Sequence, residues 1–128
     1  MIRQAVEELL RYDSSVQRVA RIVIGQVEVG GQTLGDGEFV SLVIAAANRD
    51  PDQFPDPDRL DLTRANNHHL SFGSGPHFCL GAQLARLESE IAIGALVRRL
   101  PALRLDTDVI EGRPKPALRG LERLIVAY

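Results

Sequence analysis

The sequence predicts an α+β fold for its 128 residues. Two segments carry apolar residues at helical spacing, one at the start of the chain and one from Gly81 to Leu100. Between them lie short β-branched segments separated by glycine-rich turns, a pattern typical of antiparallel strands. Hydrophobic residues make up 45% and charged residues 25% of the chain, a balance typical of a folded domain and not of a disordered segment. We therefore expect helices and small sheets within one domain-like unit, residues 1–128.

The first third of the chain predicts one helix and a set of strands. Apolar residues recur every three or four positions from Ile2 to Tyr12, which predicts a short amphipathic helix. The β-branched segment from Val19 to Ile24 predicts a strand. From Gln26 to Leu34 the residues alternate around Gly30-Gly31, which predicts a short strand and a turn. A buried strand is expected from Glu38 to Ile44.

The middle of the chain predicts irregular structure. One helical turn is expected at residues 45–48. Asp50 to Arg59 contains three prolines, which forbid a helix or a central strand and predict an ordered meander or a linker. Asn66 to Cys79 predicts a long loop, and a loop of this length inside a domain is usually functional.

The last third predicts the longest helix and two short strands. From Gly81 to Leu100 the apolar residues line one side, and Pro101 ends the helix. Strands are expected at residues 103–105 and 124–127.

Charge and composition exclude several classes of protein. The formal net charge of −2 does not indicate a nucleic-acid or anionic-membrane partner. A single cysteine excludes an internal disulfide. The longest apolar stretch, Phe39 to Ala47, is too short to span a bilayer, and the first residues lack the apolar core of a signal peptide. We therefore expect a soluble cytoplasmic protein.

The most informative segment is the ten-residue stretch from Phe72 to Gly81. Cys79 lies at the end of a glycine-rich loop and directly before the long helix, whose N-terminus favours a thiolate. Gly81 leaves room for a flat body to approach the backbone. Phe72 and Phe78 are placed to shield the sulfur from water. A thiolate bound to a large planar cofactor requires these features.

Two simpler interpretations of Cys79 stay open from these residues alone. A free cysteine is most often a buried, inert part of a core. Zinc binding by Cys79 with His77, His68 or His69 is the second, although one thiolate without Cys-x-x-Cys or His-x-x-x-His spacing fits zinc poorly.

The pattern Phe72-x-x-Gly75-x-His77-x-Cys79-x-Gly81 resembles the haem-ligand signature of the cytochrome P-450 family of haem-thiolate monooxygenases. The resemblance extends over the whole chain and is to the C-terminal portion of the soluble bacterial type. It implies the C-terminal part of the cytochrome P-450 fold, a haem b cofactor (iron protoporphyrin IX) and Cys79 as the ligand of the iron. A thiolate ligand in these enzymes favours O–O cleavage.

Two further motifs follow in the family's order. Glu8-Leu9-Leu10-Arg11 looks like the family's Glu-x-x-Arg helix, in which the two charged side chains lie on one side. Phe54 to Arg59 resembles the meander segment whose arginine completes a Glu-Arg-Arg network. The resemblance therefore predicts that Glu8, Arg11 and Arg59 form one partly buried network, whereas solvated surface charge is the simpler alternative.

The resemblance also implies contacts for the two haem propionates. Arg21 matches by position the arginine on the strand after the Glu-x-x-Arg helix, and Arg18 is a second candidate. His77 is expected to contact a propionate as well. Arg86, in the helix after Cys79, is expected to help dock an acidic redox partner, with a solvated helix face as the alternative.

Two functions are compatible with this resemblance. In the first, the chain is the haem-binding part of a monooxygenase that acts on a small hydrophobic substrate with electrons from NAD(P)H through a reductase and a ferredoxin or flavodoxin-type partner. In the second, it is a haem-binding module or remnant without turnover. The family's oxygen-activating helix, with its Ala/Gly-Gly-x-Asp/Glu-Thr motif, is expected before Met1; Gly30-Gly31-Gln32-Thr33 lacks its acid.

Overall fold

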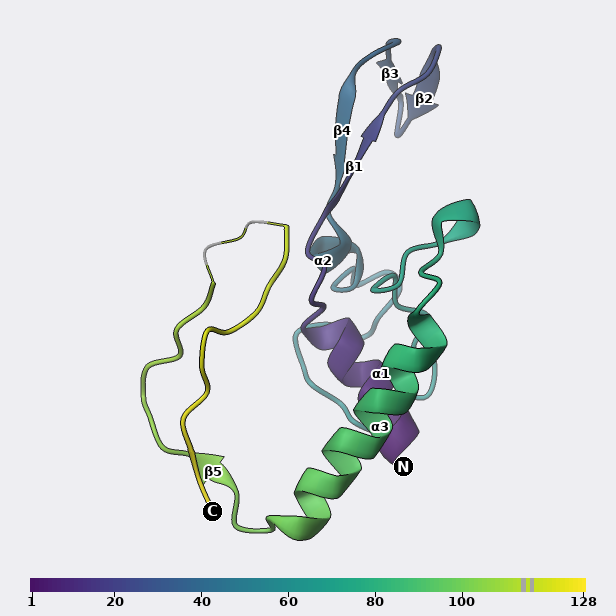
Figure 1. Cartoon of the computed structure of the whole chain (residues 1–128). Helices are drawn as coiled ribbons and strands as arrows, with labels where there is room; N and C mark the ends of the chain where they lie inside the picture. Colours follow the sequence, from purple (N-terminus) through teal and green to yellow (C-terminus); the bar gives the residue numbers. More distant parts are fainter. Residues whose placement is uncertain (114, 116) are drawn as a thin grey trace.

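The computed structural model describes residues 1–113, 115 and 117–128. Helix α1 (Ile2–Tyr12) packs against the longer helix α3 (Ala82–Arg99), and together they form the body of the molecule (Figure 1). A narrow two-stranded arm projects away from this body, and the chain after α3 turns back beside it (Figure 1). The predicted α+β class and both main helices are confirmed.

The arm contains two short antiparallel sheets. In the first, β1 (Val19–Ile22) pairs with β4 (Phe39–Leu42), so that Val19 lies opposite Leu42. At the tip, β2 (Val27–Val29) pairs with β3 (Gln32–Leu34). Gly30 and Gly31 join these two strands with φ of +56° and +76°, values that glycine adopts without strain. The hairpin predicted around the glycine pair is confirmed.

The prediction of a buried strand from Glu38 to Ile44 is wrong in its burial. Strand β4 is shorter than predicted, and Phe39 in it is 69% exposed. A two-stranded ribbon presents both faces to its surroundings, and among the described residues no second layer packs on it. A continuous apolar run therefore formed a strand here without forming a core.

Irregular structure connects the arm to α3. Helix α2 is a single turn (Ile44–Ala47), and a 3₁₀ turn (Gly75–His77) interrupts the loop that precedes Cys79. The proline-rich meander is ordered by turns, and Phe54 within it is 3% exposed. The meander is therefore a structural part of the body, which decides between the two predicted alternatives.

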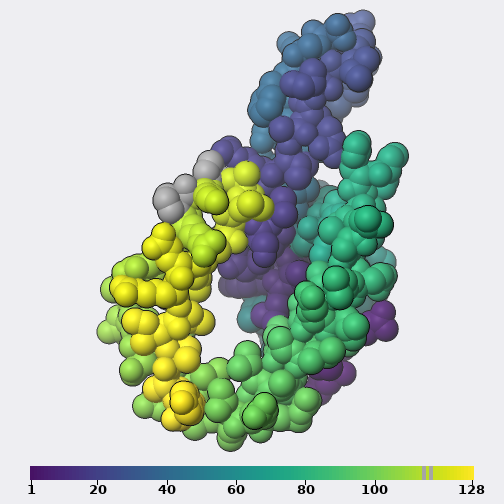
Figure 2. Space-filling view, viewed as in Figure 1, coloured from purple at the N-terminus to yellow at the C-terminus, as the bar shows by residue number. Residues whose placement is uncertain are grey.

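The C-terminal segment forms a long return loop. Strand β5 (Arg104–Leu105) pairs with β6 (Val126–Ala127) close to the end of α3. Further along the loop, the Arg119 N–H donates to the Ser15 carbonyl and the Gln17 N–H donates to the Ala117 carbonyl. Figure 2 shows an opening between this segment and the helical body.

The buried core of the described chain is small and partly charged. Its apolar members are Val6, Val23, Ile44, Phe54 and Ala82. Glu8, Arg11, Ser14 and Asn48 are buried beside them. The apolar side of α3, in contrast, is exposed, with Ile91 62% accessible. A buried ionic cluster therefore organises the body in place of a large apolar core.

Candidate functional site

Cys79 lies at the junction between the glycine loop and α3. Its N–H donates to the Phe72 carbonyl at 2.8 Å, and its own carbonyl accepts the Ala82 N–H at 3.2 Å. The first bond closes the loop on itself, and the second starts the turn that becomes α3. The backbone therefore holds Cys79 from both sides while its side chain stays exposed.

Glycine is required twice in this loop. Gly73 and Gly75 have φ of +73° and +65°, a region that residues with a side chain rarely adopt. A Cβ placed on Gly81 would lie 3.9 Å from the Cys79 sulfur. The loop thus depends on glycine for its shape, and Gly81 keeps the space beside the sulfur open.

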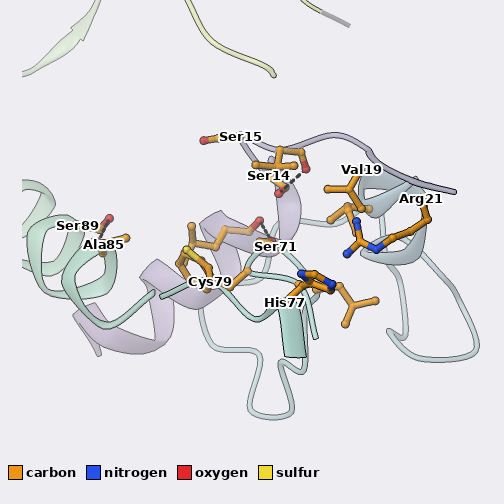
Figure 3. Close-up of a pocket in the computed structure, with 15 residues that line it drawn as sticks. Ser14, Ser15, Val19, Arg21, Ser71, His77, Cys79, Ala85 and Ser89 are labelled. Atoms are coloured by element: carbon orange, nitrogen blue, oxygen red, sulfur yellow. Dashed lines mark hydrogen bonds between the residues drawn. The ribbon is translucent and has the colours of Figure 1, made fainter. Parts of the chain in front are cut away.

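A pocket of about 460 Å³ opens beside Cys79. Its wall includes Phe72 and His77 from the Cys79 loop, Arg21 from β1, and apolar side chains that include Leu10, Val19, Ile44 and Leu70. Figure 3 shows Arg21 and His77 together on one side of Cys79. The pocket therefore combines a sulfur donor, an apolar wall and two nitrogen-bearing side chains. Four of its lining residues were predicted as site residues from the sequence, namely Cys79, His77, Arg21 and Phe72.

The outcome for the other predicted residues at this site is mixed. Gly81 does not line the pocket and acts only through the space it leaves. Arg18 does not line it either and is exposed. Phe72 and Phe78 meet edge to face with centroids 6.4 Å apart, but Phe78 is 48% exposed. The expectation that the two rings shield the sulfur is wrong for the described chain, because Cys79 is exposed.

Glu8 and Arg11 form the centre of the buried ionic cluster. Arg11 Nε and Nη2 donate to the two Glu8 oxygens at 2.8 Å each, and both side chains are fully buried. Arg11 Nη1 also donates to the carbonyls of Asn48 and Pro57. Burial alone would raise the pKa of Glu8, but hydrogen bonds from Arg11, the Asp61 N–H and Arg64 outweigh it and lower that pKa. The predicted contact between Glu8 and Arg11 is present.

The third arginine of the cluster is Arg64, so the prediction of Arg59 is wrong. Arg64 Nε donates to Glu8 Oε2 at 3.2 Å, and its guanidinium also donates to the Pro55 carbonyl. The side chain of Arg59 is exposed, and only its carbonyl reaches the cluster, where it accepts from Arg11 Nη2 at 3.3 Å. Arg59 lies on the outer side of its turn, so its backbone faces inward and its side chain faces outward.

The sequence contains a signal that could have indicated Arg64. The Asp61 carboxylate accepts both the N–H and the hydroxyl of Thr63, as in a side-chain-stabilised turn. This turn directs Arg64 back toward α1. The pattern Asp-x-Thr followed by arginine could therefore have predicted that the chain changes direction just after the meander.

A second ionic cluster surrounds Glu7, and the sequence did not indicate it. Arg86 Nε donates to Glu7 Oε1 at 2.6 Å and Arg86 Nη2 donates to Glu7 Oε2 at 3.0 Å. His69 Nε2 lies 3.1 Å from Glu7 Oε2. The Arg86 guanidinium is thus held by Glu7 and lies 4.6 Å from the centroid of Phe72, while its expected role in docking a redox partner stays a prediction.

The zinc alternative has no support among the described residues. No three His, Cys, Asp or Glu side chains converge there as metal ligands. His69, one of the proposed ligands, is instead bonded to Glu7. In the same part of the chain, no helix combines the length and the apolar character that crossing a membrane requires.

Comparison with known proteins identifies the family. Residues 1–115 match the family model for cytochrome P450. The chain belongs to the cytochrome P450 family. It is 48% identical over its full length to the biotin biosynthesis cytochrome P450 of Bacillus subtilis, of which it covers 32%. It is also 49% identical over 129 aligned residues to the vitamin D(3) 25-hydroxylase of Pseudonocardia autotrophica, again covering 32% of that protein.

Solved P450 structures have the same fold. The chain superimposes on P450BioI, solved in complex with an acyl carrier protein that carries hexadec-9Z-enoic acid, with a TM-score of 0.96 at 48% identity. This match covers 99% of the chain and 33% of P450BioI. The polyketide synthase cytochrome P450 PksS of Bacillus subtilis gives a TM-score of 0.94 at 46% identity, over 98% of the chain and 33% of PksS. The chain thus spans about a third of the P450 proteins it matches.

Membership of this family implies a haem cofactor, and the pocket fits one. Haem is a flat apolar body with a metal at its centre and two carboxylates at one edge. The pocket offers the sulfur of Cys79 for the metal and an apolar wall for the flat body. The nitrogens of Arg21 and His77 suit the two carboxylates. The space that a Cβ on Gly81 would fill beside the sulfur suits a flat group at close range.

Proposed function

We propose that this chain is the haem-binding part of a cytochrome P450 monooxygenase that oxidises a small organic substrate with O₂. The observation that carries the proposal is the pocket that Cys79, Arg21 and His77 line together. When bound, the cofactor, haem b, supplies the iron at which oxygen is activated. The described residues contribute the ligand and the binding surface for that group.

Cys79 is the residue that would hold the iron. It is the only cysteine in the chain, and its thiolate is the soft, electron-rich donor typical of this family. It lies directly before α3, whose first N–H groups have no intrahelical partners and carry partial positive charge.

Arg21 and His77 would orient the cofactor. Charged nitrogen donors bind carboxylates strongly where protein excludes water, so these two side chains suit the propionates. Arg21 Nη1 donates to the neighbouring Ala20 carbonyl at 2.8 Å, and this leaves its other donors for a ligand. The apolar wall of the pocket would exclude water from the face of the macrocycle.

The substrate and the electron source follow from the family and not from this pocket. The relatives have names as different as biotin biosynthesis cytochrome P450, 6-deoxyerythronolide B hydroxylase and vitamin D(3) 25-hydroxylase. We therefore propose a small hydrophobic substrate, with electrons from NAD(P)H through a reductase and a ferredoxin or flavodoxin-type partner, in the cytoplasm.

A carbon monoxide spectrum tests the thiolate assignment. The purified chain is loaded with haem, reduced and exposed to carbon monoxide, and the strongly red-shifted Soret band of a thiolate complex is expected. Cys79→Ala should abolish that band. A histidine-type band that survives Cys79→Ala would exclude Cys79 as the ligand.

A haem-binding module without turnover is the second candidate. Among the described residues, no carboxylate lines the pocket, whereas proton delivery during oxygen activation requires an acid or a relay. The two candidate functions are distinguished by incubation with NADPH, a surrogate ferredoxin, its reductase and hydrophobic substrates. A hydroxylated product that depends on Cys79 supports the monooxygenase. A chain that has the thiolate spectrum but forms no such product supports the haem-binding module.

A further inference from the structure

Glu7 joins three segments of the chain at one carboxylate. It lies on α1, Arg86 lies on α3, and His69 lies in the loop that leads to Cys79. The Arg86 fork donates to both Glu7 oxygens at 2.6 and 3.0 Å, and His69 Nε2 is 3.1 Å from the second oxygen. A bidentate pair of this kind fixes direction as well as distance.

The geometry also fixes which nitrogen of His69 carries the proton. The Ser71 N–H donates to His69 Nδ1 at 3.2 Å, so the proton lies on Nε2 and points at Glu7. The His69 side chain is only 2% exposed. Burial lowers the pKa of His69 more than Glu7 raises it, which agrees with a neutral ring that donates one bond and accepts another.

Both partners of Glu7 contact Phe72. The guanidinium carbon of Arg86 lies 4.6 Å from the Phe72 ring centroid, and the ring of His69 lies 5.9 Å from it at 50°. Phe72 in turn accepts the Cys79 N–H through its carbonyl at 2.8 Å. One continuous series of contacts therefore runs from Glu7 to the backbone of Cys79.

We propose that Glu7 is a positioning residue for Cys79, because it holds Arg86 and His69 against Phe72 and so fixes the residue whose carbonyl holds the Cys79 backbone. Arg86 acts as a planar group on Phe72, which a lysine would not reproduce. The Glu8 cluster has a different main role, because it anchors the meander to α1. It is linked to the Glu7 cluster through Asn48, which donates to Ser71, whose N–H donates to His69. The consequence for bound haem rests on the proposed function.

Alkylation of the single cysteine tests the positioning directly and without haem. Iodoacetamide reports Cys79 alone, because the chain has no other thiol and this one is exposed. The full chain is compared with Glu7→Gln, which removes the charge, and Arg86→Lys, which keeps the charge but loses the planar contact. Glu88→Gln, an exposed carboxylate on the same helix α3, is the matched control.

The expected result is slower alkylation in Glu7→Gln and Arg86→Lys by about 2- to 5-fold, the factor that corresponds to one exposed cation–π contact. The cause is a sulfur that is held less often at the start of α3. Glu88→Gln should match the unmodified chain. An unchanged or faster rate in both test variants would overturn the proposal. Should Glu7→Gln lose its helical circular dichroism, Arg86→Lys decides by the same rate.

A second measurement separates this proposal from the proposed function. The haem-loaded variants should shift the iron midpoint potential by about 20–40 mV, which is the same factor converted at about 59 mV per tenfold for one electron. If the unmodified chain shows no thiolate spectrum, the proposed function fails, while the haem-free alkylation rates still decide the role of Glu7. A thiolate spectrum with identical potentials in all variants would count against the role of Glu7 alone.

Discussion

The guanidinium of Arg64 lies against the carboxylate of Glu8, with Nε 3.2 Å from Oε2, and only 10% of the Arg64 side chain is exposed. Glu8 thereby accepts from two arginines, from the Asp61 N–H and from Asn67 Nδ2. A carboxylate with this many donors can be buried as an anion. The Glu-Arg-Arg arrangement of the chain is therefore Glu8, Arg11 and Arg64.

The first prediction separates Arg64 from Arg59. Arg64→Ala should lower the free energy of unfolding by about 1.5–3 kcal/mol, because hydrogen bonds to a buried charge are lost. Arg59→Ala should change it by less than about 0.5 kcal/mol, as for an exposed side chain. Urea unfolding followed by circular dichroism measures both. Equal destabilisation by the two variants would contradict the assignment of Arg64.

Arg11→Ala provides the upper limit of that series. Removal of the Arg11 side chain leaves Glu8 buried without its main partner and should lower the free energy of unfolding by roughly 3–5 kcal/mol. Arg11→Lys should recover little, since an ammonium cannot bond both Glu8 oxygens together with the Asn48 and Pro57 carbonyls.

The second prediction concerns acid stability. The folded-state pKa of His69 is lowered by burial from 6.5, so the unfolded chain binds more protons and stability falls as pH drops below about 6.5. For Glu7 and Glu8, burial would raise the pKa, but the arginine partners lower it from 4.5. The stability that Glu7 and Glu8 contribute is complete above about pH 4.5 and is lost as the pH falls through their folded-state pKa values.

Urea unfolding from pH 8 to pH 4 measures this dependence. His69→Phe should flatten the part of the curve between pH 6.5 and pH 4.5, and Glu8→Gln should flatten the part below it. A chain that becomes more stable between pH 7 and pH 5 would contradict the sign of the His69 shift, and one that becomes more stable below pH 4.5 would contradict the signs for Glu7 and Glu8.

The third prediction concerns the glycine loop. Gly75→Ala should destabilise the chain by roughly 1–2 kcal/mol, because φ of +65° strains any residue with a Cβ. Gly120→Ala is the matched control, since Gly120 has no positive φ and a Cβ there meets no atom within 4 Å. Thermal unfolding compares the two. A Gly75→Ala variant as stable as the control would show that the loop tolerates another backbone conformation.

The fourth prediction concerns the proposed propionate partners. Arg21→Ala with His77→Ala should speed haem transfer to apomyoglobin by at least about tenfold, the loss of one charge-assisted hydrogen bond of roughly 1.5–3 kcal/mol. The thiolate spectrum should persist, because Cys79 is untouched. Arg18→Ala, exposed and outside the pocket wall, serves as the control. Equal transfer rates in all three proteins would remove Arg21 and His77 from the site.

The sequence by itself determined the elements and the ligand candidate. Helical spacing gave α1 and α3 to within two residues, and the glycine pair gave the β2–β3 hairpin, because these patterns depend on backbone geometry within a few positions. The segment from Phe72 to Gly81 singled out Cys79 through its resemblance to the haem-ligand signature of the family, because that signature lies within one short stretch of sequence.

Only the tertiary structure decided which charges meet. Arg59 ends the meander and Arg64 lies five residues further along the chain, and the side chain that reaches Glu8 depends on how the turn at Asp61 is oriented in the folded chain. Glu7, His69 and Arg86 come from three segments that converge when α1 packs on α3. The tertiary structure also decided which apolar residues are buried. Strand β4 has the composition of a core strand, yet it is exposed, because no layer among the described residues covers the ribbon that it forms with β1.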